Sequence, residues 1–278
     1  MTFMGQPRHR RLAFELPDDL APAWNPALPE FAAAANAVSL MMPYVEPFVI
    51  RAAREHLPHL ETSGHTKLAN DVRVYVRQEA EHQTQHRSFN AVISRQVSGV
   101  GALERLMAWT YRALWNRGSQ RFHLAFATAS ESAAYGVARW VERNHGELFA
   151  QANPAVASLY LWHLAEEVEH KDVAYDLYDA RYRSRLPLGA AMVISVLLLA
   201  LFTVLGTTLG LAQQRRLFHP LAWVRLTRWA LGFMFSELPN MFAACLPGHH
   251  PSDFTDPVWF ELYLLDVDAT IRQNDTTR

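Results

Sequence analysis

The chain has 278 residues, half of them hydrophobic, and its 26 basic and 27 acidic side chains give a formal net charge of −1. This length suffices for a large buried core, and the balanced charge without a long basic stripe argues against nucleic acid as a partner. The single cysteine, Cys245, excludes an internal disulfide and a Cys-rich metal site, and fits a reducing cytosolic setting. The basic stretch 1–12 has no apolar run after it, so we expect no secretory signal.

In chain order, residues 1–29 come first, and their five prolines predict an extended arm rather than a helix. Apolar residues at three- and four-residue spacing then predict a series of helices, and alternating strand-like patterns are nearly absent. The predicted helices cover residues 30–56, 64–95, 102–115, 119–144 and 154–182. We expect Pro43 and Pro47 to kink the first of them.

Two helical hairpins are expected, because turn signals stand midway along each pair of long helices. The first turn is predicted between Leu57-Pro58 and Gly64. In the second pair, the run 142–146 predicts a helix end, and Asn153-Pro154 a capped helix start. The short helix 102–115 then serves as a crossover between the hairpins, which predicts an all-α, ferritin-like four-helix bundle over 30–185.

The same arrangement of carboxylates and imidazoles occurs in both hairpins. Glu79 and His82 form a Glu-x-x-His on one helix, and Glu46 precedes them on its partner. Glu131, Glu167 and His170 repeat this pattern in the second hairpin. A three-residue step keeps both side chains on one helix face, so each pair can bind a metal from one side. Four carboxylates and two imidazoles from four helices are typical of a di-iron or di-manganese centre.

The upstream glutamates decide between this interpretation and simpler ones. A single Glu-x-x-His is usually a solvated surface pair, and a buried ion-pair network is the alternative for both copies together. Glu46 and Glu131 stand in apolar stretches, where an unpaired carboxylate is costly. We therefore predict a dinuclear metal site formed by these six residues.

Other polar residues on the same helix faces are candidates for supporting roles. His86 and His163 lie one turn from predicted ligands and are expected to ligate the metal or to hydrogen-bond a carboxylate. Tyr75 and Tyr135 are expected to hydrogen-bond the cluster, although packing is the commoner role of such tyrosines. Three further carboxylates are candidates to orient histidines: Glu166, Glu169 and Asp172. Glu81 is expected to face solvent.

The stretches Phe31–Arg54, Gln78–His86 and Trp162–Tyr178 resemble a bacterial family of predicted metal-dependent hydrolases, over most of the chain. The repeated motif is also distantly similar to that of p-aminobenzoate N-oxygenase and of the ribonucleotide reductase small subunit. These resemblances imply the same six ligands. An acidic residue usually precedes the Glu-x-x-His of these oxygenases, and Gln78 takes its place in the first copy, which questions the support of a histidine there.

The C-terminal region 186–278 is expected to be an apolar helical addition. Residues 187–212 contain no charged side chain, and a helix of that length spans about 39 Å, enough to cross a bilayer. The aromatic stretch 217–246 resembles an interfacial amphipathic helix or the return of a re-entrant hairpin. We expect attachment to the cytoplasmic side of a membrane or a single span, and a buried core helix in a cytoplasmic protein is the alternative.

His249 and His250 stand near Asp253 and Asp256 and offer a second set of metal-binding groups. Their spacing suits no single helix face. A surface loop is therefore the preferred interpretation.

From the residues we expect an oxidoreductase with two iron ions, with manganese or zinc as alternatives. Glu46, Glu131 and Tyr135 are the expected catalytic groups, and a small apolar or lipid-like substrate, an electron donor and a second copy of the chain are candidate partners. The resemblance implies the first alternative, a hydrolase that uses a metal-bound hydroxide. The second alternative is a metal-binding bundle without catalysis.

Overall fold

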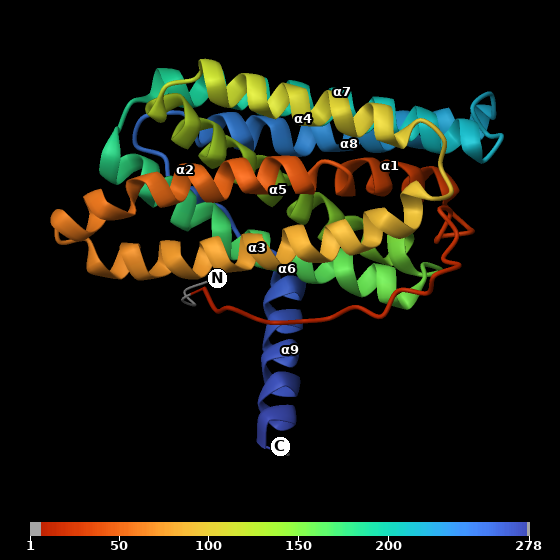
Figure 1. Ribbon diagram of the computed structural model, residues 1–278, viewed down its shortest axis with the longest axis horizontal. Helices are drawn as coiled ribbons and strands as arrows, with labels where there is room; N and C mark the ends of the chain where they lie inside the picture. The colour runs from red at the N-terminus through yellow and green to blue at the C-terminus, as the bar shows by residue number, and fades with distance from the viewer. Residues whose placement is uncertain (1–6, 277–278) are drawn as a thin grey trace.

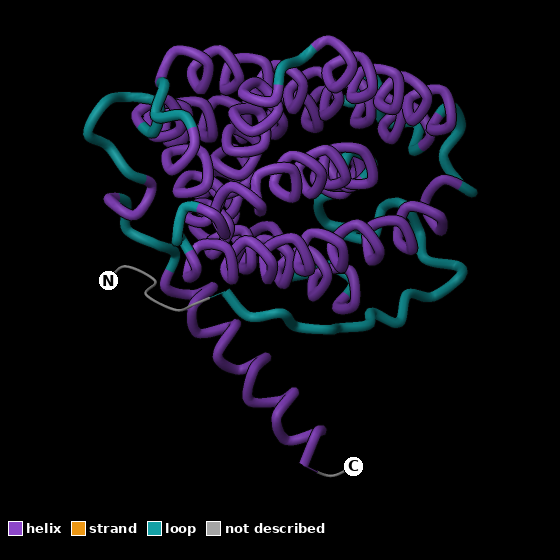
Figure 2. Tube along the Cα trace, turned by 60° about the vertical axis from the view of Figure 1, so that its left-hand side comes forward, coloured by secondary structure: helices purple, strands orange, loops and turns teal. Residues whose placement is uncertain are grey.

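The computed structural model describes residues 7–276, and within that range all regular structure is helical (Figures 1 and 2). This confirms the predicted all-α bundle. The helices are α1 (Pro29–Ser39), α2 (Met42–Thr62), α3 (Thr66–Ser94), α4 (Val100–Arg117), α5 (Gln120–Phe149), α6 (Pro154–Arg181), α7 (Arg185–Gln213), α8 (Pro220–Ala243) and α9 (Val258–Thr276), with a short 3₁₀ turn at Pro251–Asp253.

Four long helices form the centre of the molecule. The hairpin α2–α3 packs against the hairpin α5–α6, with α2 next to α5 and α3 next to α6. The crossover helix α4 contacts α2 and α7, while α9 packs against α6 at its start and projects away from the bundle (Figure 1). The four helices that carry the predicted ligands therefore surround one interior.

The first predicted helix is two helices, which corrects the expectation of one kinked helix over 30–56. The chain leaves α1 at Leu40 and Met41, and Pro43 stands in the first turn of α2. Proline fits the start of a helix because the backbone N–H that it lacks would have no partner there. Pro58 was expected in a turn but lies inside α2, which continues to Thr62.

The second hairpin differs from the prediction at one end. Helix α5 runs through Gly146 to Phe149, so the predicted helix end at 142–146 is wrong. Leu148 is buried, and its carbonyl accepts a hydrogen bond from the Asn25 side chain. These contacts stabilise the last turns of α5, although residues 144–146 have low helix propensity. The start of α6 is as predicted, because the Asn153 side chain accepts hydrogen bonds from the Ala155 and Val156 amides.

Helix α7 contains the apolar segment and lies along the bundle rather than apart from it. It packs on α1 and α5, and its glycines allow close approach: a Cβ on Gly206 would lie 2.5 Å from the Ala37 Cβ. By length and composition, both Pro29–Thr62 and Arg185–Gln213 could cross a membrane, which is weak evidence but compatible with membrane association.

The residues from 7 to 28 form an extended arm that crosses the outside of α3 and α6 (Figure 1). Its backbone is held by polar contacts: the Gln85 amide donates to the Leu12 carbonyl, and the Asn153 N–H donates to the Trp24 carbonyl. One side chain of the arm, Arg10, is almost fully buried against α6.

Candidate metal centre

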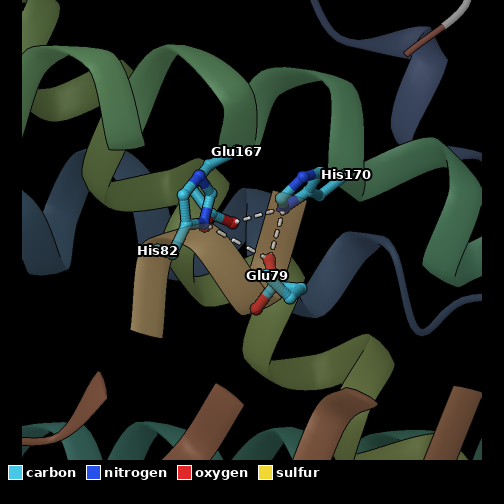
Figure 3. Close-up of side chains that lie close together, drawn as sticks. All are labelled: Glu79, His82, Glu167 and His170. Carbon is cyan, nitrogen blue, oxygen red and sulfur yellow. Dashed lines mark ion pairs between the residues drawn. The ribbon is translucent and has the colours of Figure 1, made fainter. Parts of the chain in front are cut away.

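The structure brings the six predicted ligands together in the interior of the bundle. Helix α2 contributes Glu46, α3 contributes Glu79 and His82, α5 contributes Glu131, and α6 contributes Glu167 and His170, all of them buried. Figure 3 shows the two Glu-x-x-His pairs pointing toward one another from α3 and α6. Residues far apart in the sequence thus share one centre.

Short distances join the two histidines to the carboxylates. His170 Nδ1 lies 2.8 Å from Glu79 Oε1, 3.4 Å from Glu131 Oε2 and 3.5 Å from Glu167 Oε2. His82 Nδ1 lies 3.5 Å from Glu79 Oε1 and 3.6 Å from Glu167 Oε1. Four potential ligand atoms lie within 4.8 Å of one another, one each from Glu79, His82, Glu167 and His170.

Many of the atoms that face this interior have no hydrogen-bond partner. They are both carboxylate oxygens of Glu46, one oxygen each of Glu79, Glu131 and Glu167, and the Nδ1 atoms of His82 and His170. A buried polar atom without a partner is costly, and a buried carboxylate more so. These atoms converge, and they are oxygen and imidazole nitrogen donors, so the residues fit a metal ion.

The pKa values follow from the same crowding. Burial and the charge of Glu79 raise the pKa of Glu46, and burial and the charge of Glu167 raise that of Glu131. Although burial alone would lower it, hydrogen bonds to Glu166 and Glu79 raise the pKa of His82 to about 10. Without a metal the cluster therefore retains protons, and a divalent cation would displace them.

Each histidine is oriented by the residue that precedes the glutamate of the other motif. His82 Nε2 donates to Glu166 Oε2 at 3.0 Å, and His170 Nε2 donates to the amide oxygen of Gln78 at 3.3 Å. These bonds place the hydrogen on Nε2, so Nδ1 is the atom that faces the cluster. Gln78 thus supports His170, which answers the question raised by the missing acidic residue.

Arg10 contacts both Glu166 and Glu169, and no pattern in the sequence predicts this role. Its guanidinium forms two parallel hydrogen bonds with Glu169 and a third with Glu166, all at 3.1 Å, and its Nε donates to Asp268 at 2.8 Å. Glu169 in turn accepts from the Gln78 amide nitrogen at 2.8 Å. One cation of the N-terminal arm therefore holds the residues that orient both histidines.

His86 and His163 form a hydrogen-bonded chain that leads to the cluster. The Ser39 hydroxyl donates to Asn90 Oδ1 and lies 2.7 Å from His86 Nδ1, and His86 Nε2 lies 2.6 Å from His163 Nδ1. His163 Nε2 in turn lies 2.8 Å from Glu167 Oε1, a cluster carboxylate. His163 also forms a possible metal-binding group with Glu46 and His82. Both nitrogens of His86 are engaged elsewhere, Nδ1 with Ser39 and Nε2 with His163.

The two predicted tyrosines have different positions. The Tyr75 hydroxyl donates to Glu131 Oε1 at 2.8 Å, as predicted. The Tyr135 hydroxyl instead donates to Asp256 at 2.8 Å, and Asp256 also pairs with buried Lys171 at 3.1 Å. Tyr135 is therefore corrected from a cluster residue to a member of a neighbouring polar group, because Asp256 approaches α5 from the loop before α9.

The remaining candidates lie outside the cluster. Asp172 pairs with Lys171 and faces His250, so it orients no histidine of the centre. Glu81 is partly exposed and lies 3.7 Å from His9. His250 caps the turn at 251–253 and contacts Asp176, which agrees with a loop rather than a second metal site.

The family model of predicted metal-dependent hydrolases matches residues 8–254, which include the arm, all six clustered residues and helices α1 to α8. The chain belongs to this family. No curated protein and no solved structure matches the chain. The family assignment, with the buried histidine and glutamate cluster, indicates a metal-dependent enzyme.

This assignment overturns our expectation of a di-iron oxidoreductase and agrees with the hydrolase alternative. The expectation rested on the carboxylate-rich donor set. Such donors bind several divalent metals, and the same four-helix arrangement holds them for either chemistry, so the motif alone could not separate the two reactions.

Proposed function

We propose that this protein is a metal-dependent hydrolase whose centre is held by Glu46, Glu79, His82, Glu131, Glu167 and His170. The observation that carries the proposal is the convergence of buried donor atoms without hydrogen-bond partners, in a chain of the predicted metal-dependent hydrolase family. We add His163 as a further ligand, because its Nε2 lies 2.8 Å from Glu167 Oε1 and it forms a possible metal-binding group with Glu46 and His82.

The charges of the centre favour two divalent cations. Four carboxylates converge there, and the two Glu-x-x-His histidines must be neutral to ligate a metal. Four negative charges equal the charge of two divalent ions, so such a pair would remove most of the cost of burying the carboxylates. Oxygen-rich sites with imidazole suit Mn²⁺ or Zn²⁺, and we propose these ions for the hydrolase.

Bound cations would polarise the substrate and lower the pKa of a coordinated water. The chain itself supplies the proton acceptor. Both oxygens of Glu46 lack hydrogen-bond partners, so one of them can accept a proton from the attacking water. Tyr75 and Glu166 hold Glu131 and His82 in place during this step.

A groove between α2 and α3 gives the substrate a route toward this centre. Its lining includes Pro47 and Ala80, which directly follow Glu46 and Glu79 in the sequence. Arg51, Arg54 and Glu55 also line it; Arg51 pairs with Glu55 at 3.4 Å and lies over the Trp115 ring, 3.9 Å from its centroid. Two arginines against one glutamate leave the lining with a net positive charge, which favours a substrate with a negative group, and we propose carboxylate- or phosphate-bearing esters.

The test begins with metal analysis of the purified full-length chain, followed by assays with chromogenic carboxylic and phosphoric esters. We expect about two divalent ions per chain, turnover under anaerobic conditions, and loss of turnover after chelation that Mn²⁺ or Zn²⁺ restores. Glu46→Gln should abolish turnover, while Glu81→Gln, on the surface of α3, should preserve it. Chelation without effect on ester turnover would refute the proposal.

A further inference from the structure

Helix α7 combines high hydropathy with low burial. Its most apolar 18-residue stretch has a mean hydropathy of 2.7, yet only 28 % of that stretch is buried. The inner side packs on α1 and α5 through residues such as Met192, Phe202 and Gly206. The outer side carries a stripe of exposed aliphatic residues at helical spacing: Val193, Leu197, Leu201, Val204 and Leu205. A core helix of a soluble bundle would be covered on that side.

Helix α8 continues this pattern on the same side of the bundle. It also packs on α5 and α1, and its Glu237 and Met241 side chains lie against Gly136 of α5. Its exposed residues include Val224, Leu231, Met234 and Phe235. The loop between the two helices presents Phe218, which is 92 % exposed. We call these exposed residues of α7, α8 and the connecting loop the apolar face.

The charges around the apolar face are mainly positive. Residues 180–236 contain seven arginines and no aspartate or glutamate. Three carboxylates from outside this segment pair with five of the arginines: Glu30 with Arg216 and Arg225, Glu147 with Arg228, and Asp179 with Arg183 and Arg185. Arg183 before α7 and Arg215 after it remain exposed. The face is therefore bordered by positive charge at both ends of α7.

We propose that the apolar face binds the surface of a bilayer that contains anionic lipids. A large exposed apolar patch indicates an interaction site, and cationic borders with aromatic residues match the interface of an anionic membrane. A second copy of this chain would bring the same seven arginines against each other, and the three neighbouring carboxylates offset fewer than half of their charges. The charge pattern therefore selects lipid over self-association.

The packing of α7 also determines how the membrane is engaged. Gly206 and Gly210 place the α7 backbone against Ala37 and Ala33 of α1, and Ser195 lies 3.4 Å from Ser130 of α5. These contacts hold α7 along the bundle. A crossing helix would have to give them up, so α7 and α8 lie in the plane of the interface with their outer sides among the lipids. This inference is independent of the proposed hydrolysis.

The experiment is vesicle flotation of the full-length protein. We expect it to bind vesicles of phosphatidylglycerol and phosphatidylcholine more strongly than pure phosphatidylcholine, with binding reduced by salt. The double variant Leu197→Gln, Leu201→Gln should lower the partition coefficient at least about tenfold, because two leucines no longer enter the interface. The matched control is Leu262→Gln, Leu265→Gln on α9, where both leucines are also exposed; it should bind as the wild type does.

Thermal melts monitored by circular dichroism establish that each variant is folded. Failure of the wild type to float with anionic vesicles would overturn the proposal, and so would unchanged binding of the folded α7 variant. Analytical sedimentation of the protein without vesicles tests whether the apolar face instead binds a second copy of the chain. That alternative would hold if the wild type forms a dimer that the α7 substitutions dissociate and does not bind lipid.

Discussion

The amide oxygen of Gln78 accepts a hydrogen bond from His170 Nε2 at 3.3 Å, and Gln78 thereby occupies the position that Glu166 has toward His82. The two supports differ in charge but share one geometry. Gln78 also donates to Glu169, so its amide stands between an imidazole and a carboxylate and satisfies both. A glutamate at position 78 would place two carboxylates side by side.

Replacing Gln78 with alanine should lower metal affinity about 10- to 100-fold, since His170 loses the acceptor that fixes its orientation. Gln78→Glu should not restore full affinity, because the new carboxylate would face Glu169 across the distance now bridged by a hydrogen bond. Competition with a chromogenic chelator measures both affinities. A Gln78→Ala protein with wild-type affinity would contradict the role assigned to this residue.

Arg10→Ala should destabilise the protein by about 3–5 kcal/mol, because it leaves Glu166 and Glu169 buried without their cation. Metal binding should weaken in the same variant, since both histidine supports lose their anchor. Urea denaturation of the metal-free protein measures the first effect. Arg8→Ala is the control: Arg8 is largely exposed, so its loss should cost less than about 1 kcal/mol.

Glu131→Ala should reduce the bound metal from two ions to one per chain, as measured by elemental analysis after gel filtration. Glu131 reaches the cluster from α5, and its Oε2 lies 3.4 Å from His170 Nδ1. Glu142→Ala, on the same helix outside the cluster, should keep both ions. Unchanged metal content in the Glu131 variant would invalidate the ligand assignment.

Metal binding should release protons at pH 7. In the metal-free centre the pKa of His82 is raised to about 10, so its imidazole carries a proton at neutral pH that ligation must remove. Affinity should therefore increase as pH rises from 6 toward 10. Calorimetry in buffers of different ionisation enthalpy counts the released protons, and a binding enthalpy that is the same in every buffer would contradict this expectation.

The local parts of this structure could be predicted from the sequence, and the long-range parts could not. Glu79 and His82 are three residues apart on one helix, so their common direction follows from helix geometry. Arg10 reaches Glu166 and Glu169 through a fold that no short pattern encodes. Tyr135 was misassigned for the same reason: its partner, Asp256, comes from a distant loop.

The contact between α7 and α1 depends on glycine, and the last prediction concerns this contact. A Cβ at position 206 would lie 2.5 Å from the Ala37 Cβ and 3.0 Å from its Cα, so Gly206→Ala must push the two helices apart. We expect a loss of about 1–3 kcal/mol in the free energy of unfolding. Gly189→Ala in the same helix meets no atom within 4 Å, and should stabilise the protein by up to about 1 kcal/mol through its higher helix propensity. Equal effects of the two substitutions in thermal or urea unfolding would show that α7 does not pack tightly on α1.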